Sequence, residues 1–223
     1  MVGIFVISSI FAVVDSMEED LMESFSMLDD DVLFVSKWPW SMGGDYPWWK
    51  YVQRREPSLS DSEELAGRLT QASDVAFQMK GMFNLEASEN AYPNVPVAAV
   101  SHTYPGVISL DLASGRFFNG SESAAGSPVA IVGYDIAMNL FGSEEVLGQK
   151  LKIGGKRVEV IGTFARQGES MISNGFDEFV MVPATFAPRI FDTRNVDGNS
   201  IMVKARPGIE MGILKDEVIQ QLR

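Results

Sequence analysis

The chain contains no cysteine among its 223 residues and a single histidine, His102. Without cysteine, disulfide bonds and thiolate metal sites are excluded, so an apolar core has to hold the fold together. A hydrophobic content of 46% supports such a core, and the length suits one large domain or two small ones. The composition predicts a globular fold stabilised by packing and leaves the cellular compartment open.

Positive charge is also scarce. Lys and Arg number 18 against 30 Asp and Glu, which gives a formal net charge of −12 and a sequence pI near 4.5. Phosphate backbones repel such a chain, so nucleic acid is not an expected partner. The phosphate-binding pattern G-x-x-x-x-G-K-[ST] is absent from the sequence as well, so no ATP site is encoded in it.

No apolar run is long enough to span a bilayer by itself. Residues 1–14 are apolar except for Gly3, Ser8 and Ser9, and acidic residues begin at Asp15. A spanning helix needs about 20 apolar residues. We therefore interpret this run as the end of a longer first transmembrane helix. A secretory signal peptide and a buried core helix are the alternatives, although no basic region or A-x-A site supports a signal peptide.

A helix is expected to continue from this run to Leu28. Apolar residues recur at helical spacing at Met17, Leu21, Phe25 and Leu28. No proline or glycine interrupts residues 4–28, and the first basic residue is Lys37. Basic residues mark the cytoplasmic flank of a transmembrane helix, so residues from Asp15 onward are predicted to lie outside the cytoplasm. Residues 1–28 are thus expected to form a rod that leaves the membrane.

The next part of the sequence predicts a strand, a helix and a strand. Residues 31–35 and 75–80 are the apolar strand candidates. Between them, Ser60 is expected to cap a helix that runs to about Ala72, because Glu63 stands at capping-box spacing. This order is typical of a βαβ unit.

Short apolar runs typical of strands dominate the middle of the chain. They lie at residues 97–102, 107–112, 128–133, 149–153, 157–164 and 178–182. Gly154 and Gly155 predict a two-residue hairpin turn, because glycine supplies the positive φ that the turn demands. A short helix is expected over residues 135–141, ending at Gly142. We interpret this block as an antiparallel β unit covered by a helix.

The end of the chain returns to the first pattern. Residues 200–205 predict a strand, and residues 209–223 predict a helix with one apolar side formed by Ile213, Leu214, Val218 and Leu222. The expected fold class is therefore α+β. The rod over residues 1–28 precedes a βαβ-like lobe formed by residues 29–95 and 196–223, and residues 96–195 are a β-rich insert within that lobe.

Several short motifs resemble, in their order and spacing, the periplasmic core domain of MacB-type ABC transporter permeases. This family also includes lipoprotein-release and FtsX-type permeases. The motifs are Gly115-Arg116-Phe117-Phe118, residues 128–133, Leu140-Phe141-Gly142, residues 147–155, residues 158–164 and Met181-Val182-Pro183. The opening Gly3-Ile4-Phe5-Val6 also resembles the first transmembrane helix of the family.

The resemblance implies a two-lobed extracytoplasmic domain between the first two transmembrane helices of a bacterial inner-membrane permease. One lobe would be porter-like and the other the β-rich insert, with the whole domain in the periplasm. The domain would have no catalytic activity, no cofactor and no metal. It would bind partners and transmit ATP-driven motion for export, lipoprotein release or signalling. The implied partners are a separate ATP-binding subunit, a second permease copy, a periplasmic adaptor and, through the N-terminal helix, the membrane.

All four tryptophans lie in a proline- and glycine-rich loop over residues 37–51. The candidate contact residues are Trp38, Trp40, Trp48, Trp49 and Tyr51. Clustered aromatic side chains provide a large contact area for a partner or substrate. Packing between the lobes and contact with lipid headgroups are the alternatives. The loop also supports a second functional hypothesis, a membrane-tethered module that binds a sugar or a lipid.

Other polar clusters carry weaker hypotheses. Consecutive carboxylates at residues 29–31 and 177–178 rarely converge on one cation, so we expect them to face solvent and to bind no metal. Residues 170–175 form a polar loop of a kind that often contacts partners. A hydrolase is the least expected function, since His102 is the sole histidine and no G-x-S-x-G motif is present.

Overall fold

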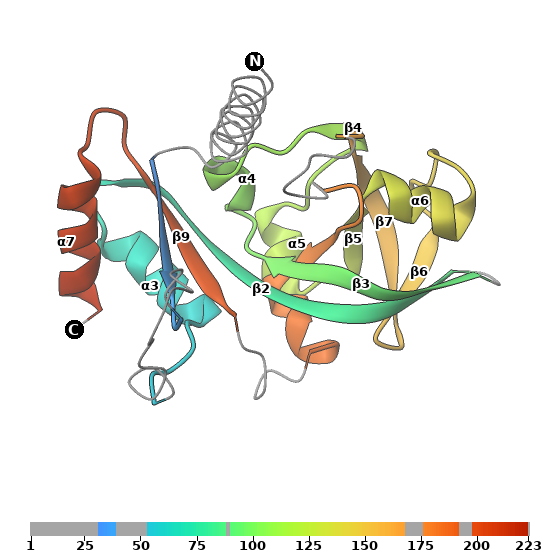
Figure 1. The fold of residues 1–223 in the computed structure, drawn as a ribbon, viewed down its shortest axis with the longest axis horizontal. Coiled ribbons are helices and arrows are strands. Elements are labelled where there is room, and N and C mark those ends of the chain that lie inside the picture. Colours follow the sequence, from blue (N-terminus) through green and yellow to red (C-terminus); the bar gives the residue numbers. More distant parts are fainter. Residues whose placement is uncertain (1–30, 39–52, 88–89, 168–175, 192–197, 223) are drawn as a thin grey trace, which may run out of the picture.

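The computed structural model describes residues 31–38, 53–87, 90–167, 176–191 and 198–222, and strands dominate it (Figure 1). All of the described strands belong to one nine-stranded sheet. The strands are β1 (Val32–Ser36), β2 (Ala72–Ala87), β3 (Asn90–Val100), β4 (Leu112–Gly115), β5 (Val129–Val132), β6 (Lys150–Ile153), β7 (Lys156–Phe164), β8 (Val180–Pro183) and β9 (Ser200–Ala205). Their order is β1-β9-β2-β3-β8-β5-β7-β4, and β6 pairs with both β2 and β7.

One end of the sheet contains a βαβ unit that is completed by the end of the chain. Strand β1, helix α3 (Leu59–Arg68) and strand β2 follow each other in sequence, but β9 lies between the two strands. Because β9 is antiparallel to both neighbours, β1 and β2 run parallel. Leu65 of α3 and Leu214 of α7 (Met211–Gln221) are both buried in the core of this end. Burial of these apolar side chains explains why α7 returns to the first part of the fold.

Strand β2 also takes part in a closed ring of strands, from which β4 is excluded. Strand β2 pairs with β3, β3 with β8, β8 with β5, β5 with β7, β7 with β6, and β6 pairs back with β2. Each strand buries at least one apolar side chain in a shared core: Leu85, Val97, Val180, Val132, Val160 and Leu151. This part is thus a small closed barrel. Helix α6 (Tyr134–Phe141) packs on β2, β3 and β7, while the 3₁₀ helix η1 (Ala184–Arg189) packs on β2, β3 and β8.

The opposite face of the sheet has a cover of its own over β3, β5 and β8, the beginning of β2, the end of β7 and part of β9. The chain after β3 forms α4 (Tyr104–Val107) and, after β4, helix α5 (Gly120–Ala125). Tyr104, Phe118 and Met181 belong to a second buried cluster on this face. Burial raises the pKa of Tyr104 to about 12, although the hydrogen bond with Gln78 acts in the opposite direction. The phenol is therefore neutral and part of the core.

Several local predictions are confirmed. Strand β1, strand β9 and the hairpin between β6 and β7 lie where the sequence places them. The hairpin turn has φ values of 55° and 76° at Gly154 and Gly155. Helix α6 ends at Gly142, whose φ of 69° is left-handed. These elements depend on residues close together in sequence, which explains why local patterns identify them.

The cap and the end of α3 were predicted at the wrong residues. Ser58, and not Ser60, caps the helix: its hydroxyl accepts the Asp61 amide, and the Asp61 carboxylate accepts the Ser58 amide at 2.9 Å. The Ser58–Asp61 pair has the same spacing as Ser60–Glu63, so spacing alone does not separate them. The helix ends at Arg68, because strand β2 already begins at Ala72.

Other corrections concern residues whose partners are distant. Residues 107–112 are not a strand; Pro105 favours a helical start in α4, and the strand begins at Leu112. The insert is also not purely antiparallel, since β3–β8 and β5–β7 are parallel pairs. Ile213 on α7 and Leu222 directly after it are 53% and 49% exposed, because only one narrow side of the helix faces the core.

The predicted transmembrane end and rod at residues 1–28 lie outside the described residues. Within the ranges that the structure describes, no helix has the length and apolar character that crossing a membrane requires. The domain boundaries proposed from the sequence stay a prediction.

Candidate functional site

Strand β2 connects the two ends of the sheet. Its residues 72–78 pair with β9, residues 78–87 pair with β3, and residues 85–86 also pair with β6 (Figure 1). A strand with hydrogen-bonded neighbours resists bending much more than a free chain does. Strand β2 therefore makes a stiff link between the βαβ end and the barrel.

Helix α7 is attached to the beginning of β2 through one carboxylate. The Glu217 carboxylate accepts hydrogen bonds from the Thr70 amide at 2.8 Å, the Thr70 hydroxyl at 2.7 Å and the Gln71 amide at 3.1 Å. Partial burial opposes the charged form, but the hydrogen bonds from Thr70 and Gln71 outweigh it and lower the pKa of Glu217. The carboxylate is thus charged at neutral pH and joins α7 to the residues that precede β2.

Arg206 strengthens the same junction from the end of β9. Its amide donates to the Gln71 carbonyl at 2.9 Å, and its guanidinium Nε donates to the Ala72 carbonyl at 3.0 Å. Arg206 also acts on Glu217 through its charge and favours the ionised carboxylate. The end of α3, the end of β9 and helix α7 therefore meet at residues 70–72.

Local sequence patterns do not predict this junction. Thr70 and Glu217 are separated by 147 positions, so no local pattern connects them. The only local signal is a glutamate on the polar side of an amphipathic helix, which many helices share.

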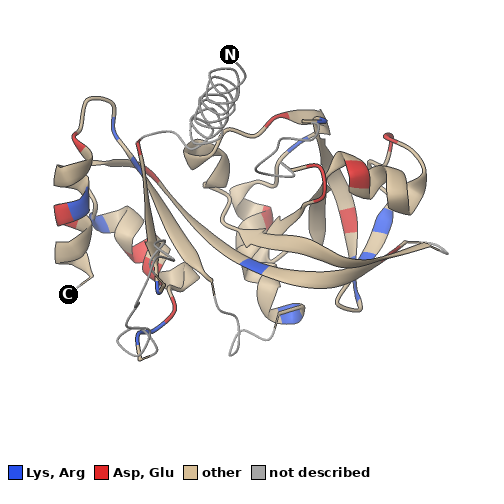
Figure 2. Ribbon diagram, viewed as in Figure 1, with Lys and Arg blue, Asp and Glu red and all other residues tan. Residues whose placement is uncertain are grey.

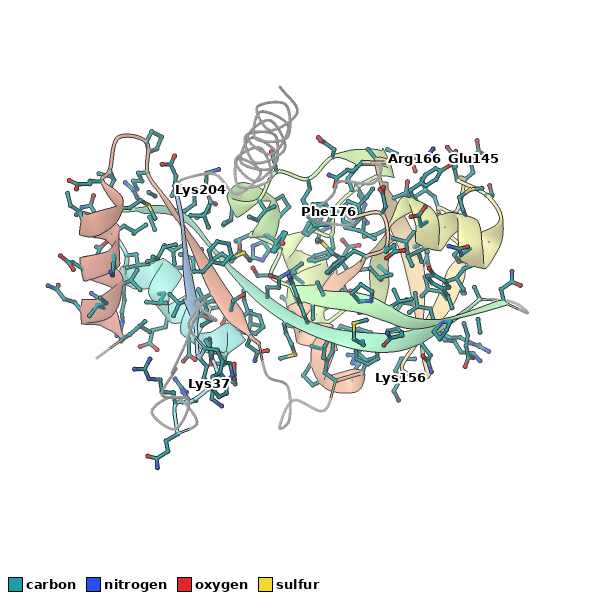
Figure 3. The ribbon with its side chains drawn as sticks, in the orientation of Figure 1. Lys37, Glu145, Lys156, Arg166, Phe176 and Lys204 are labelled. Atoms are coloured by element: carbon teal, nitrogen blue, oxygen red, sulfur yellow. The ribbon has the colours of Figure 1, made fainter. Side chains whose placement is uncertain are left out.

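Of the predicted aromatic contact residues, only Trp38 lies within the described part. It is half-buried just after β1, and the Lys37 ammonium lies 5.4 Å from the centroid of its ring. Lys37 also lies 3.6 Å from a Glu56 carboxylate oxygen, and Figure 3 shows Lys37 at the lower end of β1. Trp38 is therefore held beside β1 by local contacts. The role predicted for Trp40, Trp48, Trp49 and Tyr51 falls outside the described residues and stays a prediction.

The remaining polar candidates have structural surroundings. Asp177 was expected to face solvent, but it is 5% exposed, and its carboxylate accepts the Gln167 amide at 3.0 Å. It thus ties together the two ends of the polar loop that includes residues 170–175, which are not among the described residues. His102 is exposed and lies beside Gly120. In the described part, no group of three or more His, Cys, Asp or Glu side chains is placed to hold a metal ion.

The sheet, the closed barrel and the junction on β2 define an α+β domain with two joined parts. The chain belongs to the family of MacB-like periplasmic core domains, whose profile matches residues 1–221. The resemblance drawn from the short motifs is thereby confirmed. The family consists of periplasmic domains of ABC transporter permeases.

Individual proteins agree with this assignment. The chain is 23% identical over 205 residues to the macrolide export ATP-binding/permease protein MacB of Marinobacter nauticus, covering 91% of this chain and 31% of that protein. It is 31% identical over 93 residues to the pyoverdine export ATP-binding/permease protein PvdT of Pseudomonas aeruginosa, covering 41% and 14%. The matched segments are therefore less than one third of each relative.

A solved structure shares the fold. The periplasmic region of MacB from Actinobacillus actinomycetemcomitans superimposes with a TM-score of 0.71 at 14% identity. The match covers 90% of this chain and 86% of that one. At this level of identity the similarity concerns the fold.

Proposed function

We propose that this chain is the extracytoplasmic domain of an ABC transporter permease subunit that binds partner proteins and transmits ATP-driven motion. The domain performs no chemistry of its own. Its location is the periplasmic side of a bacterial inner membrane, to which the predicted helix over residues 1–28 attaches it. The motion serves export, lipoprotein release or signalling.

The observation that carries this proposal is the way both outer segments of the domain reach β2. Strand β1, where the described chain begins, reaches β2 through β9. Helix α7, where it ends, reaches β2 through the three hydrogen bonds to Glu217. A displacement of either segment is therefore passed to β2 and from there to the barrel. A continuous hydrogen-bonded sheet moves as one body, which is what transmission of motion requires.

The proposed partners follow from the same role. A separate ATP-binding subunit supplies the energy, because no phosphate-binding motif occurs in this sequence. A second permease copy would move in step with this one, and a periplasmic adaptor would receive the motion. The relatives named as ATP-binding/permease proteins support the association with an ATPase.

The test separates ATP hydrolysis from transport in the intact transporter. A flexible glycine linker inserted near Ser16 interrupts the proposed rod, so we expect transport to be lost while most of the ATPase activity remains. The matched control places the same linker after Ser143, in an exposed turn that follows α6. The control should retain both activities. Transport that survives the insertion near Ser16 would show that the rod does not transmit motion.

A further inference from the structure

The outside of the barrel is unevenly covered. On β3, β5 and β8, the outward-facing Ala98, Ile131 and Met181 are fully buried beneath the second core cluster. On β2, by contrast, the outward-facing Met82 is 55% exposed. Strand β6 and the first half of β7 also present their outer face to solvent, since their buried side chains Leu151, Ile153, Val158 and Val160 all belong to the inner core. The end of β7 differs, because Phe164 is buried in the second cluster.

Basic side chains gather on this uncovered part and beside the hairpin turn that borders it. We name as the cationic hairpin surface Lys150, Lys152, Lys156, Arg157 and Arg189. Lys150, Lys152 and Arg157 lie on the outward face of the β6–β7 hairpin. Lys156 is the register partner of the inward-facing Ile153 and lies exposed beside the turn. Arg189 lies close to this turn, because its neighbour Ile190 lies against Gly154. Figure 2 shows blue segments on β6, at the β6–β7 turn and on η1, and Figure 3 places Lys156 at the lower edge of the molecule.

Few acidic groups balance these charges. Glu86 pairs with Lys152 at 3.0 Å, and Glu159 is the strand partner of Lys150. Five positive and two negative side chains leave a local charge of +3 on a chain whose net charge is −12. Lys150, Lys156, Arg157 and Arg189 form no ion pair with any residue that the structure describes.

Two of these positive charges face each other directly. Lys152 and Arg157 are register partners in the antiparallel β6–β7 pair, on the same outward face. Like charges in this position destabilise a sheet, whereas an opposite charge at either residue would stabilise it. Glu86 compensates Lys152 only. The arrangement thus reduces the stability of the hairpin and creates a surface that attracts carboxylates.

We propose that the cationic hairpin surface binds an extended acidic segment of a partner protein, with carboxylates on alternate residues. Lys150 and Lys152 are two positions apart on one strand, roughly 6.5 Å, which is the spacing of alternate side chains on an extended chain. The carboxylates of Glu86 and Glu159 interrupt the positive charge and favour a patterned protein segment over a uniformly anionic bilayer. This inference deepens the proposed function, on which the identity of the partner as a transporter component rests.

The experiment measures binding of a fluorescein-labelled peptide of alternating Glu and Ser residues to the full chain. The peptide with the same composition in two blocks, Glu and then Ser, tests the spacing. We expect the alternating peptide to bind more tightly, and affinity to fall as salt rises. The variant Lys156→Gln/Arg157→Gln should bind about threefold to tenfold more weakly. Its melting temperature should equal or exceed that of the wild type, because like-charge repulsion is relieved.

The matched control is Lys215→Gln/Arg166→Gln, which removes two exposed positive charges elsewhere and should bind like the wild type. Equal weakening in this control would overturn the proposal, because net charge alone would then explain binding. Equal affinity for the block peptide, tighter binding to phosphatidylglycerol vesicles, or a lower melting temperature of the hairpin variant would overturn it as well. The binding assay does not measure transport. A negative result for peptide binding would therefore leave the proposed function intact.

Discussion

The contact of Glu217 with Thr70 and Gln71 gives the sharpest test of how α7 is attached. The substitution Glu217→Ala removes three hydrogen bonds to one charged acceptor. A hydrogen bond to a charged group contributes up to about 3 kcal/mol when buried, but these groups are partly reached by solvent. We therefore expect the free energy of unfolding to fall by about 1 to 2 kcal/mol. In a domain of this size the melting temperature should drop by about 2 to 8 °C.

Two measurements locate the effect. Thermal unfolding gives the loss of stability, and hydrogen exchange should show faster exchange at the Thr70 and Gln71 amides, which donate to this carboxylate. The effect also depends on pH. Because the folded state lowers the pKa of Glu217 below the ordinary 4.5, its stabilisation is present above pH 4.5 and is lost as pH falls through the folded value. The difference between wild type and Glu217→Ala should therefore shrink at acid pH.

The neighbouring Asp216 provides the matched control. It carries the same charge on the same helix, and it is exposed. Asp216→Ala should change the free energy of unfolding by less than about 1 kcal/mol, so the melting temperature should change correspondingly little. Equal destabilisation by the two substitutions, or unchanged amide exchange at Thr70 and Gln71 in Glu217→Ala, would refute the attachment of α7 through this carboxylate.

Three further predictions concern the cap of α3, the barrel and the aromatic loop. Ser58→Ala should lower stability by about 1 kcal/mol in urea unfolding and Ser60→Ala much less; the reverse order would contradict the observed cap. Leu151→Ala should cost about 2 to 5 kcal/mol by the same measurement, because the 1% exposed side chain fills the barrel where β6 closes it. Trp48→Ala together with Trp49→Ala should weaken transport with the melting temperature nearly unchanged, and a large fall in that temperature would instead support packing between the lobes.

Local sequence patterns were sufficient for elements whose causes lie within a few residues. The paired glycines at 154 and 155 and the glycine after α6 each set a backbone conformation that neighbours hardly influence. Where two equivalent local patterns compete, as with Ser58 and Ser60, spacing does not identify the cap, and the prediction of Ser60 was wrong. The return of the chain to the βαβ end at β9 and α7 was also predicted, although Ile213 and Leu222, which the spacing placed on the apolar side of the helix, are exposed.

Contacts between distant residues were beyond such patterns. Nothing near Glu217 indicates Thr70, and nothing in the short strands indicates that β6 pairs back to β2. The cationic hairpin surface likewise depends on register, because Lys152 and Arg157 face each other only once β6 and β7 are paired. Composition and periodicity indicate most of the segments that become strands and helices, and the order of short motifs indicates the family by resemblance. The closed barrel, the junction at residues 70–72 and the grouping of charges arise from pairing across the sheet, where chain packing decides which side chains meet.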